Sequence, residues 1–248
     1  CVYLSLSLSL THTLAAHSHL GLCRIARRVV HCVIGFCLLL VAVFRPCLCL
    51  PPLCFFLVAG RRGNPFLRRW KRVWSGDKQN PLIDARNRFE ALLLRFARDF
   101  VSPRMGGQPC LFQREPTLRV VFPSPFATGR PHSDSEYYHQ PGEINWWMPI
   151  SDEVFDGNTL YVESVPGRRD FHPLNLKYGQ ICRFYGNLCT HYCVPNDTPI
   201  TRVSIDFRTI PLPYYDDSYT HLPSGYVPFR LGSYYRISDE TQLMHQEK

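Results

Sequence analysis

The chain has 248 residues, of which 45% are hydrophobic and 13% aromatic, a composition typical of a globular protein with one large domain or two smaller ones. Its formal net charge of +8 is unevenly distributed. Residues 1–76 contain ten Lys or Arg and no acid, whereas residues 77–248 contain 18 basic against 20 acidic residues. Because the excess positive charge belongs to the N-terminal segment, we do not expect the rest of the chain to bind nucleic acid.

Residues 1–62 differ in kind from the rest of the chain. They combine a Ser-Leu repeat with two apolar runs, Val29–Phe44 and 47–60, which an Arg-Pro pair separates. A membrane-spanning helix needs about 20 apolar residues, and neither run is that long. A targeting or anchor segment is one interpretation, translated non-native sequence a second and folded structure a third. We expect a separate catalytic domain over residues 63–248, with membrane contact only through this leader.

The cysteines divide in the same way, with seven of the 11 in residues 1–54. The other four are irregularly spaced, which argues against a disulfide framework and favours reduced thiols in a reducing compartment. Two of them lie two residues before and after His191, an arrangement that suggests zinc. However, residues two apart on a strand are about 6.6 Å apart, whereas ligands of one zinc lie within about 4 Å of each other. We therefore expect Cys189 and Cys193 to form small apolar lining; the other two cysteines of this part are Cys110 and Cys182.

A helix is predicted over residues 82–101, where apolar side chains recur at helical spacing. We expect its apolar stripe to pack on the outside of a sheet, with partner binding as the alternative. The stripe consists of Phe89, Leu92, Leu93, Phe96, Ala97 and Phe100.

From Leu111 onward the chain alternates short strand-like segments with turns that contain Pro or Gly, and no strong helix is predicted before Phe207. This spacing is typical of a sandwich or jelly roll, so the predicted fold class is mainly β. The candidate strands are Leu118–Phe122, Ile144–Pro149, Thr159–Ser164, Gln180–Asn187, Leu188–Val194 and Thr201–Ile210.

Three residues form a candidate metal site. His132 and Asp134 form a His-x-Asp motif, which puts an imidazole and a carboxylate within reach of one cation. His191, 191 − 132 = 59 residues later, would complete three ligands on one face of the metal. Two histidines and one carboxylate are the ligand set that leaves positions open on non-haem Fe(II).

The last candidate strand carries a candidate site for an organic carboxylate. Its residues alternate, so that Val203, Ile205 and Phe207 point to one face and the polar residues to the other. Arg202 and Ser204 therefore share a face, and a guanidinium can bind a buried carboxylate bidentately.

This order of residues, His-x-Asp, a distant His and then Arg-x-Ser, resembles the Fe(II)/2-oxoglutarate-dependent dioxygenases. It is most similar to the branch found in streptomycin-type and other carbohydrate-modifying gene clusters. The resemblance covers roughly Leu111 to Asp217, somewhat under half of the chain. The stretches that carry it besides the motifs are EINWWMPIS, NTLYVESVPG, LKYGQICRFYGN and TRVSIDFR.

The resemblance implies a fold, a site and a reaction. The fold would be a double-stranded β-helix, a cupin-like jelly roll, with a supporting helix. His132, Asp134 and His191 would bind Fe(II), and Arg202 with Ser204 would hold the distal carboxylate of 2-oxoglutarate. The reaction would use dioxygen to hydroxylate a small, sugar-linked molecule, with release of succinate and CO2. Related halogenases keep the position of Asp134 small so that chloride can bind, so the carboxylate favours hydroxylation or another oxidation.

Two other classes of function stay open. The fold could serve a non-oxidative metal-dependent cupin enzyme such as an isomerase, but the pair of Arg202 and Ser204 argues against this. Alternatively, the chain could be a binding protein on a degenerate oxygenase fold. The intact set of five motif residues argues against decay.

Other residues around the motifs are candidates for the pocket. Asn145 and Trp147 share a strand face. Asn145 is predicted to bind the proximal carboxylate or oxo group of 2-oxoglutarate, and Trp147 to form either a pocket wall or core. Arg119 and Arg130 are further pocket candidates.

The residues that follow the His-x-Asp motif are predicted to form a substrate loop. Tyr137, Tyr138 and His139 favour stacking and hydrogen bonding, as on a sugar ring. On the last candidate strand, Asp206 and Arg208 are predicted to pair with each other or with neighbouring residues.

Overall fold

The computed structural model describes residues 2–5, 83–219 and 228–238. Most of the leader at residues 1–62 lies outside these ranges, and so does the predicted boundary with the domain at 63–248. Val2–Ser5 form strand β1, which pairs with β9. Of the helices in the described ranges, none has the length and hydropathy needed to cross a membrane.

One long helix supports the fold, and it matches the prediction for residues 82–101. It begins as α3 and continues through a π-helical turn, η3, into the short helix α4. Two further segments are short 3-10 turns. The bounds are α3 (Ile83–Phe96), η3 (Ala97–Val101), α4 (Ser102–Arg104), η4 (Asp134–Tyr137) and η5 (Leu212–Tyr214).

The described part of the chain is mainly β, as predicted, and its paired strands are antiparallel. A seven-stranded sheet has the order β1-β9-β4-β11-β2-β12, with β3 also paired to β11. A three-stranded sheet has the order β10-β6-β7, and β5 pairs with β8. The strands are β2 (Cys110–Gln113), β3 (Thr117–Val121), β4 (Ile144–Pro149), β5 (Glu153–Val154), β6 (Leu160–Val162), β7 (His172–Pro173), β8 (Leu176–Lys177), β9 (Gln180–Phe184), β10 (His191–Cys193), β11 (Arg202–Pro211) and β12 (Tyr235–Ile237).

Strand β11 lies in the middle of the large sheet. It pairs with β4 along one edge and with β3 and then β2 along the other. Its side chains alternate as predicted: Ile205 and Phe207 belong to the core that includes α3. The polar residues of the opposite face are also buried, and they are Arg202, Ser204, Asp206 and Arg208.

The apolar face of the large sheet packs on α3 and η3. Phe96 of α3 stacks on Phe100 with 4.8 Å between ring centroids and contacts Phe207 edge-on at 6.3 Å. Trp146 and Met148 of β4 join the same cluster. The helical stripe predicted from the sequence is therefore core.

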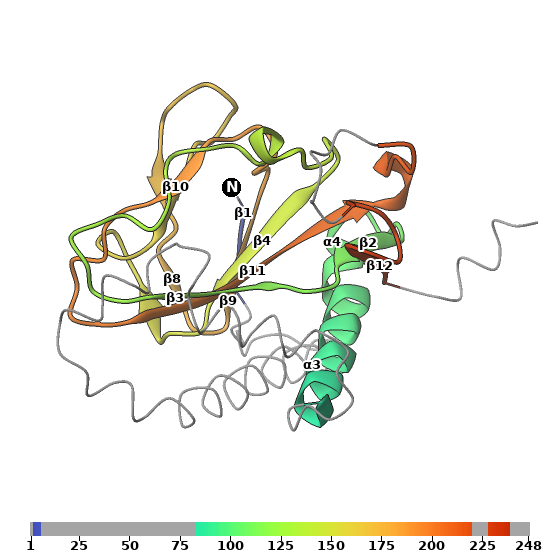
Figure 1. Ribbon diagram of the computed structural model, residues 1–248, viewed down its shortest axis with the longest axis horizontal. Helices are drawn as coiled ribbons and strands as arrows, with labels where there is room; N and C mark the ends of the chain where they lie inside the picture. Colours follow the sequence, from blue (N-terminus) through green and yellow to red (C-terminus); the bar gives the residue numbers. More distant parts are fainter. Residues whose placement is uncertain (1, 6–82, 220–227, 239–248) are drawn as a thin grey trace, which may run out of the picture.

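The other face of the large sheet contacts the smaller sheets through a second apolar cluster. Trp147 of β4 and Phe184 of β9 pack there with Leu160 and Val162 of β6. In Figure 1, α3 and β10 lie on opposite sides of β4 and β11. This arrangement places the polar face of β11 between the two parts of the β structure, away from the supporting helix.

Replacing Phe96 with Ala should lower the free energy of unfolding by about 3–5 kcal/mol, because it removes a fully buried ring from the helix–sheet core. Chemical denaturation followed by circular dichroism measures this change. Ile200→Ala is the control, since Ile200 is exposed and its loss should cost no more than about 0.5 kcal/mol. Equal losses in the two variants would contradict the assignment of α3 to the core.

Candidate metal centre

The structure brings the three predicted ligands together. His132 and His191 face each other across an isolated antiparallel bridge, with backbone N–H to carbonyl distances of 3.1 and 2.9 Å. Their ring centroids are 4.6 Å apart. Asp134 begins η4, where its backbone N–H donates to the carbonyl of Gly186 at 2.9 Å. One ligand atom from each of the three side chains can be chosen so that all lie within 4.8 Å of one another.

Backbone carbonyls fix the orientation of both histidine rings. Nδ1 of His132 lies 2.8 Å from the carbonyl oxygen of Arg130, and Nδ1 of His191 lies 3.0 Å from that of Cys189. Since a carbonyl oxygen only accepts, each Nδ1 carries the hydrogen and each Nε2 keeps its lone pair. A ring held in this way is oriented to bind a metal through Nε2.

The carboxylate of Asp134 is buried and engaged through one oxygen. Its Oδ2 accepts from Nδ2 of Asn145 at 2.7 Å and from Nε of Arg208 at 2.8 Å. Its Oδ1 lies 3.6 Å from Nε2 of His191. Burial alone would raise the pKa of Asp134, but the charge and hydrogen bond of Arg208, together with His191, outweigh burial and hold the pKa below its ordinary value. An ionised carboxylate is the form that binds a metal.

Burial also acts on His191. It lowers the pKa of this ring, and the opposing effect of Asp134 is smaller. The neutral ring is the form that can ligate a cation. The donor set, two imidazole nitrogens and one carboxylate oxygen, therefore fits a divalent metal with open coordination positions.

On the same face of β11, Arg202 and Ser204 form a polar socket. NH1 of Arg202 donates to the carbonyl of Asn158 at 3.0 Å, and the guanidinium also contacts Sγ of Cys193. Nε of Arg202 and Oγ of Ser204 are buried without a hydrogen-bond partner among the described residues. A buried polar group without a partner costs about 1–3 kcal/mol. An anion that accepts from both atoms would satisfy them, and Arg202 and Ser204 themselves line neither of the two cavities described below.

A cavity of about 60 Å³ opens beside the metal site. His132, His191 and Asn145 line it, together with Trp147, which the sequence left as either pocket wall or core. A larger groove of about 600 Å³ lies at the ends of β4, β9 and β11 and contains none of the predicted site residues.

The other charged candidates are engaged in ion pairs. Nε of Arg119 lies 2.6 Å from Oδ1 of Asp206, and NH2 of Arg130 lies 2.9 Å from Oε2 of Glu136. Arg119, Arg130, Asp206 and Arg208 all line the small cavity. The prediction that Asp206 and Arg208 pair with each other or with neighbours is confirmed, since Arg208 pairs with Asp134.

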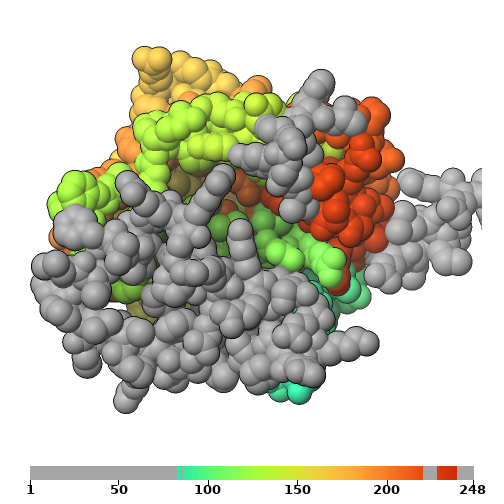
Figure 2. Space-filling model, in the orientation of Figure 1, coloured from blue at the N-terminus to red at the C-terminus, as the bar shows by residue number. Residues whose placement is uncertain are grey.

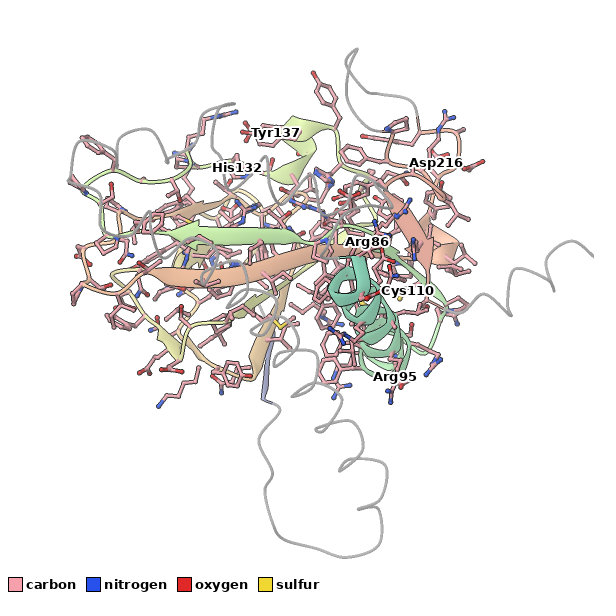
Figure 3. All side chains as sticks on the ribbon, turned by 60° about the horizontal axis from the view of Figure 1, so that its bottom comes forward. Arg86, Arg95, Cys110, His132, Tyr137 and Asp216 are labelled. Carbon is pink, nitrogen blue, oxygen red and sulfur yellow. The ribbon has the colours of Figure 1, made fainter. Side chains whose placement is uncertain are left out.

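The three residues of the predicted substrate loop do not themselves line the small cavity, and one of them, Tyr137, contacts a residue that does. Tyr137 lies next to His132, with ring centroids 5.1 Å apart, and the two residues are labelled close together in the upper part of Figure 3. Tyr138 is exposed and has a left-handed backbone with φ of 66°. The expectation for His139 is wrong: its ring is buried and Nδ1 lies 2.8 Å from Oε2 of Glu143. The left-handed residue before it turns the chain inward.

The four cysteines of the described part are free thiols. Cys189 belongs to the second apolar cluster and Cys193 packs against it, in agreement with the expected lining role. Among the described residues, the group with metal-ligand spacing is His132, Asp134 and His191, without a cysteine.

Several residues of the site have no sequence signal that identifies them. Glu143 is fully buried beside Arg208, and Tyr235 of β12 donates a hydrogen bond to it. Gly186 approaches Asn145 so closely that a Cβ at Gly186 would lie 2.7 Å from the Asn145 side chain. These partners are far apart along the chain, so spacing rules do not reveal them.

Comparison with known proteins supports the resemblance that the motifs predicted. No family profile matches the chain. It is 37% identical over 123 residues to the streptomycin biosynthesis protein StrG of Streptomyces griseus, across 50% of this chain and 58% of StrG. The match thus spans little more than half of that relative's length. The chain is similar to StrG, as the sequence motifs indicated.

Solved structures with a weaker similarity include two enzymes of nogalamycin biosynthesis. The non-haem alpha-ketoglutarate-dependent epimerase SnoN is 14% identical, with a TM-score of 0.43, over 70% of this chain and 87% of SnoN. The non-haem alpha-ketoglutarate-dependent carbocyclase SnoK is 15% identical, with a TM-score of 0.41, over 57% of this chain and 65% of SnoK.

Replacing Gly186 with Ala should weaken divalent metal binding by about 10–100-fold, the range found when residues that orient a ligand are changed. The added methyl group would push Asn145 away from Asp134. Calorimetric titration with Co(II) measures the effect. Gly129→Ala is the steric control, because a Cβ there meets no atom within 4 Å. Unchanged affinity in Gly186→Ala would show that this close contact does not support the site.

Proposed function

We propose that the protein is an Fe(II)- and 2-oxoglutarate-dependent oxygenase that acts on a small molecule. The observation that carries this proposal is the pair of buried atoms without partners, Nε of Arg202 and Oγ of Ser204, on the β11 face that also reaches the metal ligands. A metal triad alone serves many chemistries, whereas a triad combined with a carboxylate socket suits a cosubstrate that both chelates and carries a second carboxylate.

Each residue has a distinct task in this proposal. His132 and His191 offer Nε2 and Asp134 offers Oδ1, so three protein atoms hold the cation and leave its other positions available. Fe(II) with 2-oxoglutarate and dioxygen supplies the oxidising power, and succinate and CO2 are the coproducts. The protein supplies orientation and exclusion of water.

The socket orients the cosubstrate. Arg202 and Ser204 bind its distal carboxylate, and burial strengthens these hydrogen bonds because little water competes for them. Asn145 donates one amide hydrogen to Oδ2 of Asp134. Its second amide hydrogen is available to the proximal carboxylate or oxo group, which is the role we propose for it.

The architecture that we propose is the double-stranded β-helix. The large antiparallel sheet and the sheet of β10, β6 and β7 share an apolar cluster, and His191 contacts Phe184 of this cluster with 5.4 Å between ring centroids. The supporting helix α3 covers the outer face of the large sheet.

The lining of the small cavity favours an uncharged primary substrate. Arg119 pairs with Asp206, Arg208 with Asp134 and Arg130 with Glu136, so the positive charges around the metal site are each matched. Tyr192 and Tyr137 offer aromatic faces and hydroxyl groups nearby. We propose a hydroxyl-bearing, sugar-linked small molecule, because aromatic faces and hydroxyl groups suit a sugar ring. The similarity to a streptomycin biosynthesis protein supports a small-molecule substrate in general.

The test of the function is turnover of 2-oxoglutarate. The Fe(II)-loaded protein should convert 2-oxoglutarate to succinate in air even without its primary substrate, at a low uncoupled rate. His191→Ala should abolish this conversion. A folded, metal-binding protein that produces no succinate and consumes no oxygen would favour the non-oxidative cupin alternative.

Replacing Arg202 with Met should raise the dissociation constant for 2-oxoglutarate by about 30-fold or more, because truncating one partner of a buried charged pair costs at least about 2 kcal/mol. Ser204→Ala should raise it by about tenfold, in line with about 1.5 kcal/mol for one hydrogen bond to a charged group. Anaerobic titration of Co(II)-loaded protein measures both constants. Metal affinity should stay unchanged, and wild-type affinity for 2-oxoglutarate in both variants would overturn the socket assignment.

A further inference from the structure

The metal ligand Asp134 is held by two neighbouring strands. Asn145 of β4 and Arg208 of β11 are directly paired positions of the large sheet. Because paired residues point to the same face, both side chains reach the same carboxylate oxygen, Oδ2 of Asp134, at 2.7 and 2.8 Å. This leaves Oδ1, which lies 3.6 Å from Nε2 of His191, as the oxygen nearer to that histidine.

Arg208 is itself fixed by a buried network. Its Nε lies 3.6 Å from Oε2 of Glu143, and its NH1 lies 3.5 Å from the hydroxyl oxygen of Tyr234. Glu143 accepts in turn from the Tyr235 hydroxyl, and Nδ1 of His139 lies 2.8 Å from Oε2 of Glu143. The network therefore ties Asp134 to the end of the described chain, which is coloured orange-red at the surface in Figure 2.

The charges around Arg208 explain why its guanidinium stays paired with Asp134. Arg208 lies between two buried carboxylates, those of Asp134 and Glu143. Breaking either pair would leave an uncompensated charge inside the protein, which is strongly unfavourable. The guanidinium is therefore confined to the position in which its Nε meets Oδ2 of Asp134.

We propose that Arg208 and Asn145 are positioning residues, which occupy Oδ2 of Asp134 so that the carboxylate offers the metal Oδ1 alone. Neither residue is a ligand. A carboxylate restricted to one oxygen takes one coordination position and leaves the next one for the cosubstrate. The role of the free coordination position, to take the cosubstrate, rests on the proposed function. The way in which Asn145 and Arg208 hold Asp134 concerns metal binding itself.

The test compares two arginines of the same strand face by calorimetric and visible titration with Co(II). The first variant combines Arg208→Met with Glu143→Gln, which removes the donor without leaving Glu143 charged and unpaired. Its Co(II) affinity should fall by about 10–100-fold, and its visible spectrum at saturation should differ from that of the wild type. The matched control is Arg202→Met, which should keep the wild-type affinity and spectrum because Arg202 does not touch Asp134.

A second variant keeps the test decisive if the first does not fold. Asn145→Ala removes one neutral donor and exposes no charge, and it should change the spectrum and weaken Co(II) binding by about tenfold. The single replacement Arg208→Lys should bind Co(II) more tightly than the variant that combines Arg208→Met with Glu143→Gln, because lysine keeps a cationic donor. Weaker binding with an unchanged saturated spectrum would assign these residues a structural role only and overturn the proposal, as would wild-type affinity in a folded variant.

The Co(II) titrations can fail or succeed independently of the proposed function. If the wild-type protein binds Co(II) but never turns over 2-oxoglutarate, the oxygenase assignment fails while the spectra still decide how Asp134 is held. If 2-oxoglutarate turnover is present and the Asn145→Ala spectrum is unchanged, the oxygenase assignment stands and the positioning proposal fails.

Discussion

The structure depends on the burial of both faces of β11. One face packs Ile205 and Phe207 against α3, which fixes the register of the strand, because a shift by one residue would exchange the two faces. The other face carries Arg202 and Arg208, two buried guanidinium groups that need partners. The apolar packing on one side therefore sets the positions of the charged groups on the other.

Along that polar face, each charged residue of β11 has a different partner. Arg202 lies at one end, held by the carbonyl of Asn158 and left with Nε unpaired. Asp206 is neutralised by Arg119 in the middle, and Arg208 at the far end holds Asp134. Alternate residues of a strand are about 6.6 Å apart, so one strand spans the distance from the Arg202–Ser204 pair to the arginine that holds Asp134. A single rigid element thus relates the two halves of the proposed site.

The sequence predicted the parts that depend on periodicity or motif order. Alternation identified β11, and the His-x-Asp motif with a later His identified the ligands that the structure brings together. It did not predict the bonds between Asp134 and its partners Asn145 and Arg208, because these join residues 11 and 74 positions apart through side-chain geometry. Adjacency to the motif was misleading for His139, because after the left-handed residue Tyr138 its ring is buried and pairs with Glu143. Short strands such as β2 and β12 carry too few residues for a periodic signal.

The most direct measurement is an anaerobic titration of the protein with Fe(II) and then 2-oxoglutarate, followed through the weak visible charge-transfer band of the chelate. We expect a band in the wild-type protein and none in His191→Ala, because the chelate needs the metal that His191 would help to hold. Absence of the band in folded, metal-loaded wild-type protein would contradict the assignment of 2-oxoglutarate as cosubstrate.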